Sequence, residues 1–338
     1  MVEWLWVLGF ALLSLLLTAV LRRYALARSL MDIPNARSSH SIPTPRGGGV
    51  SIVIAFLLAV SWLGATGRMP ADLLMALAGA GGLVAVIGFM DDHGHIAARW
   101  RLLGHFAAAI WALAWLGGMA PLHLLGWSLE LGWLGNVLAV FYLVWMLNLY
   151  NFMDGIDGIA SIEAVTVCGS ACLIYALTGP GDQVLVPALL AAAVAGFLYW
   201  NFPPARIFMG DAGSGFLGIV LGVLSLQAGW VSPSLFWAWL ILLGVFVVDA
   251  TLTLIRRLLR GEKVYEAHRS HAYQFASRHY ARHLPVTLAV LVINLVWLLP
   301  WALLVAKGWV DGVTGLVLCW LPLVWLALKF KAGQVERG

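Results

Sequence analysis

The sequence predicts an all-α fold, a polytopic bundle of about eleven transmembrane helices in one domain that covers residues 1–338. Hydrophobic residues make up 62% of the 338 residues and charged residues only 11%, whereas soluble domains average about 45–50% apolar and about 25% charged. Mostly apolar windows of roughly 20 residues, long enough to cross about 30 Å of hydrocarbon, follow one another along the chain. The short connectors and the lack of a fixed-period repeat favour a single domain.

The apolar windows define the predicted elements in order. We place the spans at residues 2–21, 48–65, 71–90, 102–119, 133–151, 160–177, 184–200, 214–230, 232–255, 286–306 and 312–329. The first window has Glu3 before it and Arg22 and Arg23 after it. Because no basic segment precedes it, we expect an anchor and not a cleaved signal peptide. The three cysteines all fall inside apolar windows, so we expect them to pack as small hydrophobic residues.

The basic residues predict the orientation. Of the 20 Lys and Arg residues, all but Arg68 and Lys307 fall on one side of the predicted spans. Because positive residues stay on the cytoplasmic side, we expect the N-terminus outside and the C-terminus in the cytoplasm. The cytoplasmic loops are then residues 22–47, 91–101, 152–159, 201–213 and 256–285. The net charge of +4 reflects this topology, and no nucleic-acid partner is expected.

Acidic residues gather on the same predicted face. Asp91, Asp92, Asp154, Asp157 and Asp211 come from three connectors, each beside Gly or Asn. A charge at bilayer depth costs on the order of 3 kcal/mol, so residues of this kind are functional candidates. Carboxylates brought together raise one another's pKa values, and a divalent cation relieves the conflict. Mg²⁺ is the preferred cation because it takes oxygen ligands from one or two carboxylates and from substrate phosphates, with Mn²⁺ as the alternative.

Two polar segments add candidate ligand groups. In residues 148–158, polar side chains recur at every third position: Asn148, Asn151, Asp154 and Asp157. The glycines in this run predict that the helix ends there, so the amides and carboxylates can converge on a sugar, a base or a cation. In residues 201–215, a Gly-Asp-Ala-Gly-Ser-Gly run opens a span and can present backbone N–H groups to an anion, although it lacks the Gly-Lys-Ser/Thr ending of a P-loop.

Basic and histidine residues supply candidate phosphate contacts. Arginine suits phosphate oxygens, although arginines next to a membrane also serve topology and lipid headgroups. His268 and His271, spaced i and i+3, can touch phosphate or metal but also suit an ordinary surface helix. Next to Asp91 and Asp92, the histidines at 93 and 95 are weaker candidate ligands than the two aspartates.

These motifs resemble those of the polyprenyl-phosphate N-acetylhexosamine-1-phosphate transferases, glycosyltransferase family 4. Four blocks carry the resemblance: residues 43–49 (Pro-Thr-Pro-Arg-Gly-Gly-Gly), 88–92 (Gly-Phe-Met-Asp-Asp), 148–158 and 201–218. A looser fifth block comprises 249–257 followed by 268–271. The resemblance implies a bundle of ten or eleven helices in the bacterial cytoplasmic membrane, with a cytoplasmic catalytic cleft. It implies that a UDP-sugar gives its sugar phosphate to undecaprenyl phosphate and that UMP is released. A homodimer and a monomer are both open.

The resemblance also implies residue roles by position. Asp211 would be the principal magnesium ligand, and Asp91 and Asp92 would place the metal and the lipid phosphate. Asp91 would accept a proton if one is transferred, although an ionised lipid phosphate needs no base. His268 and His271 would contact the diphosphate or the sugar.

The donor pocket is implied in the same way. The implied substrate-binding residues are Asn148, Asn151, Asp154, Asp157, Asn201, Phe208, Arg46, Arg99, Arg101 and Arg269, with Phe208 stacking on uracil. The chain departs from the pattern at Arg99 and Arg101, where relatives often use Lys. Its Ala-His-Arg-Ser-His-Ala-Tyr-Gln block is closest to the branch that initiates O-antigen or related surface glycans. The sugar, an N-acetylhexosamine or a 6-deoxy relative, is left open.

Two other classes compete with this interpretation. A secondary transporter also has many spans and polar residues in the membrane, but transporters place their sites near the midplane on broken helices, whereas these acids cluster at one face. A CDP-alcohol phosphotransferase would need an Asp-Gly-x-x-Ala-Arg block, which is missing after Asp154.

Overall fold

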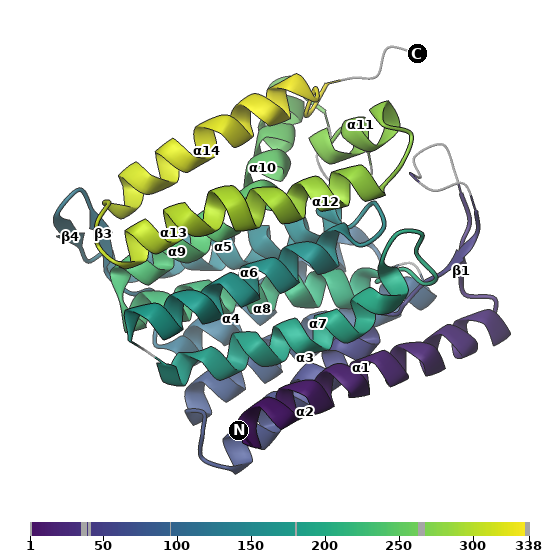
Figure 1. The fold of residues 1–338 in the computed structure, drawn as a ribbon, viewed down its shortest axis with the longest axis horizontal. Coiled ribbons are helices and arrows are strands. Elements are labelled where there is room, and N and C mark those ends of the chain that lie inside the picture. Colours follow the sequence, from purple (N-terminus) through teal and green to yellow (C-terminus); the bar gives the residue numbers. More distant parts are fainter. Residues whose placement is uncertain are drawn as a thin grey trace.

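The computed structural model describes residues 2–34, 39, 42–94, 96–179, 181–262 and 268–334, and they form a bundle of long helices (Figure 1). The helices of the bundle are α1 (Val2–Ala27), α2 (Val50–Ala65), α3 (Ala71–His93), α4 (Ala98–Leu116), α5 (Gly132–Met153), α6 (Ile159–Thr178), α7 (Leu185–Asn201), α8 (Asp211–Val231), α9 (Pro233–Leu242), α10 (Gly244–Leu259), α12 (Leu284–Val292), α13 (Leu299–Ala306) and α14 (Gly312–Lys329). A short helix α11 (Ala272–His279) and a 3₁₀ turn (Gly181–Val184) lie in connectors.

The predicted membrane-helix bundle is confirmed. Among the described residues, eight helices are long and apolar enough to cross a membrane, or nine if the bent pair α9 and α10 counts as one span. Helix α2 is apolar but shorter than these, and α4, which carries Arg99 and Arg101 in its first turn, is not among them. Each predicted span has a helix at its place, whereas the count of eleven crossings and the orientation of the termini stay predictions.

Helix α8 forms the centre of the bundle. Nearly all of its residues are buried, and α3 and α5 pack along it. The close approach of α3 depends on Gly88, since a Cβ there would lie 2.5 Å from the backbone nitrogen of Ala212. Large apolar side chains such as Leu5, Trp133 and Val296 are exposed on the outer helices, as expected for a surface that faces lipid.

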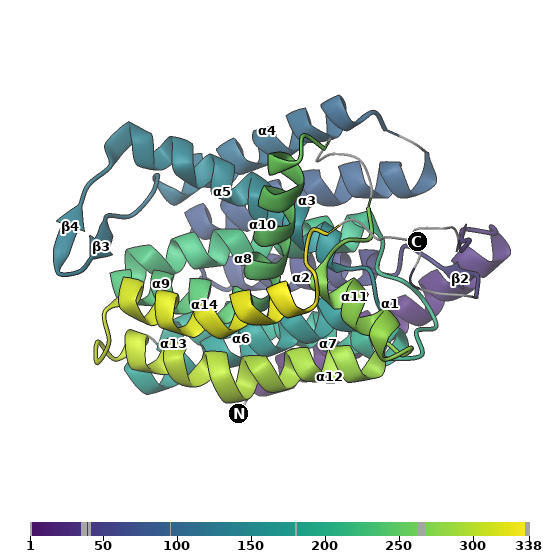
Figure 2. The same ribbon diagram turned by 90° about the horizontal axis from the view of Figure 1, so that it is seen from above.

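Two predicted spans are not regular helices. The predicted span 232–255 is the pair α9 and α10, bent by 70°, so that α10 leaves the direction of the bundle (Figure 2). The predicted span 286–306 consists of α12, a π-helical segment (Ile293–Leu298) and α13. The π-helical segment carries the buried Asn294, whose Nδ2 donates to Glu163 Oε2 at 2.7 Å and to Thr166 Oγ1 at 2.7 Å.

Two short antiparallel ribbons complete the fold, β1 (Met31–Asp32) with β2 (Thr44–Pro45) and β3 (Leu122–Leu124) with β4 (Trp127–Leu129). In the first ribbon, Met31 is opposite Pro45 and Asp32 is opposite Thr44. The chain after β2 continues this pairing with the α7–α8 connector, because the Phe208 N–H donates to the Pro45 carbonyl at 2.8 Å and the Gly48 N–H donates to the Phe208 carbonyl at 2.9 Å. This pairing brings the first loop to the start of α8.

Candidate active site

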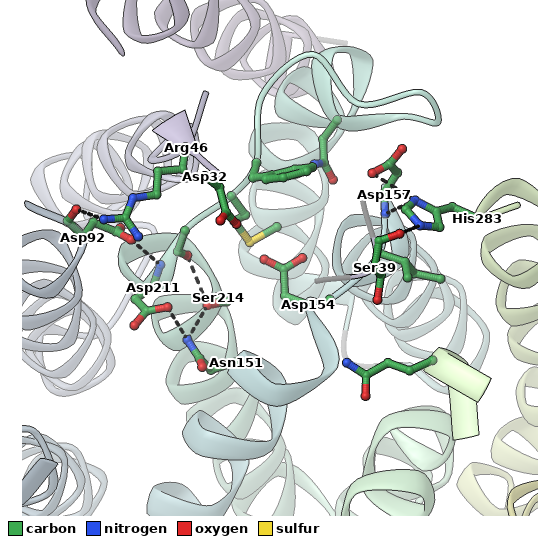
Figure 3. Close-up of a pocket in the computed structure, with 17 residues that line it drawn as sticks. Asp32, Ser39, Arg46, Asp92, Asn151, Asp154, Asp157, Asp211, Ser214 and His283 are labelled. Carbon is green, nitrogen blue, oxygen red and sulfur yellow. Dashed lines mark hydrogen bonds and ion pairs between the residues drawn. The ribbon is translucent and has the colours of Figure 1, made fainter. Parts of the chain in front are cut away.

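A polar cavity of about 220 Å³ lies where the first loop, the end of α3 and the connectors before α6, α8 and α12 meet (Figure 3). Its wall includes Asp32, Ser39, Arg46, Asp92, Asn151, Asp154, Asp157, Asn201, Phe208, Asp211, Ser214, Gln274 and His283. The structure therefore brings together eight of the residues predicted for the site, from four parts of the chain far apart in sequence.

Asp92 holds the start of α8. Its side chain is buried, and its carboxylate accepts the backbone N–H groups of Asp211 at 3.2 Å and of Ala212 at 3.3 Å. The first N–H groups of a helix have no partner within the helix and carry a partial positive charge, so an ionised acid is favourable there. Gly210, with φ of +78°, lets the chain turn against this carboxylate, since a Cβ at Gly210 would lie 2.7 Å from Asp92 Oδ2.

Asp211 is the first residue of α8 and faces the cavity. Asn151 Nδ2 donates to Asp211 Oδ1 and to Ser214 Oγ, both at 3.0 Å. On its other side, Arg101 Nη1 lies 3.5 Å from Asp211 Oδ2 and also pairs with the carboxylate of Asp91. Arg101 therefore bridges two of the predicted acids.

Asp154 is the acid with a free carboxylate. Figure 3 shows it pointing into the cavity, and no described side chain or N–H group donates to it. Burial raises the pKa of Asp154 well above its usual range, and the negative charges of Asp211, Asp92 and Asp157 raise it further. This carboxylate is available to a ligand.

Asp157 and Asn201, in contrast, use their polar atoms on the protein. Asp157 Oδ2 accepts the N–H of Ala205 at 3.0 Å, and Asp157 Oδ1 lies 3.1 Å from His283 Nδ1. The buried Asn201 accepts the Gly158 N–H at 3.1 Å and donates to the Ile207 carbonyl at 3.1 Å. Both residues line the cavity by joining the α5–α6 connector to the α7–α8 connector.

Arg46 from the first loop and Phe208 from the α7–α8 connector also line the cavity. Arg46 donates through Nη2 to the main-chain carbonyl of Asp92, while its buried Nε has no hydrogen-bond partner among the described residues. This places a guanidinium with unused donor capacity beside the carboxylates, which suits an anionic ligand.

Seven predicted residues do not line this cavity, and two of them, Asp91 and Arg101, lie next to it because Arg101 pairs with Asp211. Asn148 donates to the Val144 carbonyl of its own helix at 2.7 Å, and the exposed Arg99 stacks on Trp100. The other three, Arg269, His268 and His271, precede or begin α11. His95 and parts of the loops 22–47 and 256–285 lie outside the described residues.

His268 and His271 form a separate cluster beside the C-terminal end of α5. Their ring centroids are 4.8 Å apart, and each lies 6.4 Å from the ring of Phe152. Burial, together with the charges of His271 and Arg257, lowers the pKa of His268 to about 3, so His268 is neutral at pH 7. Asp249 accepts the N–H groups of Ala272 at 2.9 Å and Tyr273 at 3.0 Å. It therefore holds the start of α11 as Asp92 holds the start of α8.

The sequence reasoning missed five of the wall residues of the cavity: Asp32, Ser39, Ser214, Gln274 and His283. Gln274 reaches the cavity because α11 packs near the end of α5, where the Tyr273 hydroxyl donates to the Phe152 carbonyl at 2.9 Å. His283 follows Arg282 at the foot of a predicted span, and that position was the available signal. Its partner Asp157 is 126 residues away, so no local pattern could identify the pair.

The donor set of the cavity suits a hard divalent cation. Arg101 and Arg46 are the cations beside Asp91, Asp92, Asp154 and Asp211, so this group of side chains is net negative. Within the described residues, no three His, Cys, Asp or Glu side chains form a ready metal cage. Mg²⁺ is commonly held by one or two carboxylates together with waters and substrate phosphates. The metal roles of Asp211 and Asp92 stay predictions.

Fold and site together define a polytopic membrane protein that presents carboxylates and guanidinium groups to a ligand at one end of its helix bundle. The family model for glycosyl transferase family 4 matches residues 73–229. The chain is 31% identical over 320 residues to a probable undecaprenyl-phosphate N-acetylglucosaminyl 1-phosphate transferase of Bacillus subtilis, covering 93% of this chain and 84% of that protein.

Two further relatives extend the comparison. A decaprenyl-phosphate N-acetylglucosaminephosphotransferase of Mycolicibacterium smegmatis is 30% identical over 295 residues, which are 78% of this chain and 72% of that protein. A phospho-N-acetylmuramoyl-pentapeptide-transferase of Geobacillus kaustophilus is 29% identical over 259 residues, 72% of this chain and 78% of that protein. The chain belongs to glycosyl transferase family 4, and it is a phosphosugar transferase.

Proposed function

We propose that the protein transfers a sugar 1-phosphate from a UDP-sugar to undecaprenyl phosphate, releasing UMP. The sugar is an N-acetylhexosamine or a 6-deoxy-N-acetylhexosamine, and the product starts a lipid-linked surface glycan of the O-antigen kind. The named relatives support the acceptor, since two of them are named for undecaprenyl or decaprenyl phosphate. The observation that carries the proposal is the cavity in which Asp92, Asp154 and Asp211 face Arg46.

The reaction joins two anions, so charge is its main obstacle. An oxygen of the lipid phosphate attacks the β-phosphorus of the donor, the bond from that phosphorus to the oxygen bridging the two phosphates breaks, and its electrons leave with UMP. Positioning and charge neutralisation dominate catalysis of such transfers. Arg46 and Arg101 would bind phosphate oxygens, and Asp211 and Asp92 would hold Mg²⁺. When bound, the ion would neutralise the diphosphate.

Other residues would bind the donor and accept a proton. Asp154, with its free carboxylate, would accept hydroxyl or imide N–H groups of the donor, and Phe208 would stack on uracil. Asp91 would leave its pairing with Arg101 to accept a proton when the acceptor phosphate arrives protonated. At neutral pH the lipid phosphate is largely ionised, so this proton transfer is not required for the reaction.

The reaction and the donor are tested together by one assay. Purified protein in detergent, undecaprenyl phosphate and Mg²⁺ are incubated with a panel of UDP-sugars, and UMP release is measured. We expect UMP release with one UDP-N-acetylhexosamine or 6-deoxy relative, and its loss in Asp211→Asn. The matched control is Asp72→Asn, an exposed acid in the first turn of α3, which should keep wild-type activity. Full activity in Asp211→Asn would reject the metal role of Asp211.

We also propose that the protein lies in the bacterial cytoplasmic membrane with the cavity facing the cytoplasm, where UDP-sugars are made. The bias of Lys and Arg toward the cavity side supports this orientation. The transporter alternative has no support, because the relatives that match are named as transferases and the polar cavity is formed by connectors at the end of the bundle.

A further inference from the structure

A second cavity adjoins the first. It measures about 550 Å³ and shares Ser39, Asp157, Phe208 and His283 with the first cavity. Sites for small ligands usually measure about 300–1,000 Å³. The carboxylate cavity, at about 220 Å³, falls below that range by itself, whereas the two cavities together fall within it. A ligand of nucleotide-sugar size that binds in the first cavity therefore has to extend into the second.

His283 stands at the boundary between the two cavities. Its side chain is 16% exposed, and its Nδ1 lies 3.1 Å from Asp157 Oδ1. Its Nε2 lies 2.9 Å from the main-chain carbonyl oxygen of Ser39 in the first loop. Figure 3 shows the ring between these two partners at the edge of the cavity. The imidazole thus joins the α5–α6 connector to the first loop.

Asp157 has contacts to three parts of the chain through its side chain and its main-chain carbonyl. Its other carboxylate oxygen accepts the N–H of Ala205 from the α7–α8 connector at 3.0 Å. Thr287, one helical turn after His283, donates its hydroxyl to the Asp157 carbonyl at 2.8 Å. Because His283 and Thr287 share one face of the helix start, α12 fixes both the side chain and the main chain of Asp157.

We propose that His283 is a positioning residue for the donor: by fixing Asp157 and the first loop, it shapes the passage through which one nucleotide-sugar occupies both cavities. The inference rests on the proposed function and deepens it. His283 and α12 lie outside residues 73–229, the part of the chain that the family model matches.

The positioning depends on the protonation of His283. Both ring nitrogens face oxygen acceptors, so the imidazolium satisfies both contacts, whereas a neutral ring has only one N–H to donate. The main-chain N–H of Asp157 also lies 3.4 Å from Nδ1 and competes with the carboxylate contact when that nitrogen is bare. Burial lowers the pKa of His283, but the Asp157 hydrogen bond and charge and the Ser39 carbonyl outweigh it, so the pKa is raised.

The surrounding charges are shared between the two cavities. Besides His283 and Asp157, the first cavity is lined by the acids Asp32 and Asp154, and the second is lined by the basic residues Arg278 and Arg282. Since the folded-state pKa is raised, the imidazolium contacts are complete below the ordinary pKa of histidine and are lost as the pH rises through the raised value. Donor binding should therefore weaken on the alkaline side.

The experiment measures the KM for the UDP-sugar and kcat in the UMP-release assay from about pH 6 to about pH 9. His283→Leu removes both contacts, and we expect the donor KM to rise about 10-fold or more, the effect of losing a charged hydrogen bond, with a smaller change in kcat. His283→Asn keeps one uncharged donor toward Asp157, so it should recover part of the affinity and lose the alkaline rise in KM. His279→Leu, an exposed histidine of α11, is the matched control and should behave as wild type.

Two outcomes overturn the inference alone. One is a donor KM in His283→Leu within about twofold of wild type, and the other is an alkaline rise in KM that persists in His283→Asn. If the Leu variant fails to fold, the pH profile of the Asn variant decides. Wild-type protein that releases no UMP from any UDP-sugar would instead reject the proposed function, and the inference with it.

Discussion

Gly88→Ala tests whether the close contact between α3 and α8 sets the active-site geometry. A Cβ added at Gly88 would lie 2.5 Å from the nitrogen of Ala212 and 2.6 Å from the carbonyl carbon and oxygen of Asp211. Real Cβ contacts are not found below 3.0 Å, and ordinary contact begins at 3.4 Å. The start of α8 therefore has to move away from α3 by about 0.9 Å, the difference between 3.4 and 2.5 Å.

This displacement acts on the hydrogen bonds that Asp92 makes to α8. They already measure 3.2 and 3.3 Å, so a shift of that size breaks both. Asp211 moves with the helix, and a misplacement of about 1 Å at a reacting centre costs on the order of 100-fold in rate. Overpacking a helix contact also costs about 1–3 kcal/mol of stability. We expect kcat for UMP release to fall by about 100-fold while the protein remains folded.

The matched control is Gly82→Ala on the same helix, where a new Cβ meets no atom within 4 Å. Alanine is the better helix former by up to about 1 kcal/mol, so this variant should keep its activity and have the same or a higher thermal midpoint. UMP release at saturating substrate and thermal unfolding in detergent give the two readouts. A kcat for Gly88→Ala within about threefold of wild type, or an equal loss in Gly82→Ala, would refute the reasoning.

Three other predictions use the same preparations. Asn294→Leu should lower the thermal midpoint, since hydrogen bonds between membrane helices contribute about 0.6 and at most about 1.7 kcal/mol and Glu163 loses its donor; an unchanged midpoint would argue against this contact. The raised pKa of Asp154 means that it takes up a proton at a higher pH than an ordinary carboxyl group. As the pH is lowered, activity should therefore decline at a pH well above the range in which ordinary carboxyl groups titrate. Asp154→Asn should remove that pH dependence from the activity that remains. An introduced cysteine at Gly94 should resist impermeant thiol reagents added to intact cells, whereas one at Lys307 should react; the reverse pattern would overturn the orientation.

Local sequence patterns were sufficient to predict the helices and the gathering of the acids. Whether a stretch of chain is apolar enough to cross a membrane depends on its own composition, so the apolar windows predicted where the helices lie. Asp92, Asp154 and Asp211 come together because three connectors meet at one end of the bundle, and their common side could be inferred from the distribution of charge. Hydropathy carries no information on backbone direction, however, so the 70° bend between α9 and α10 was not predictable from an uninterrupted apolar run.

The partners of the site residues were the least predictable part. Asp157 reads as a ligand in the sequence, but its oxygens are taken by Ala205 and His283. Arg101 is a candidate phosphate clamp in the sequence, and its pairing with Asp91 and Asp211 was not predicted. Such pairings depend on which helix ends meet in three dimensions, and a single sequence contains no record of those distances.

The two acids that hold helix starts have a consequence for how the enzyme responds to ionic strength. Asp92 at α8 and Asp249 at α11 are compensated by main-chain N–H groups, whose partial charges lie inside the protein and are poorly screened by dissolved ions. An anionic substrate that approaches Arg46 or Arg282 from solution has to displace counterions on the way. Added salt should therefore slow the capture of substrate while leaving the architecture that receives it undisturbed.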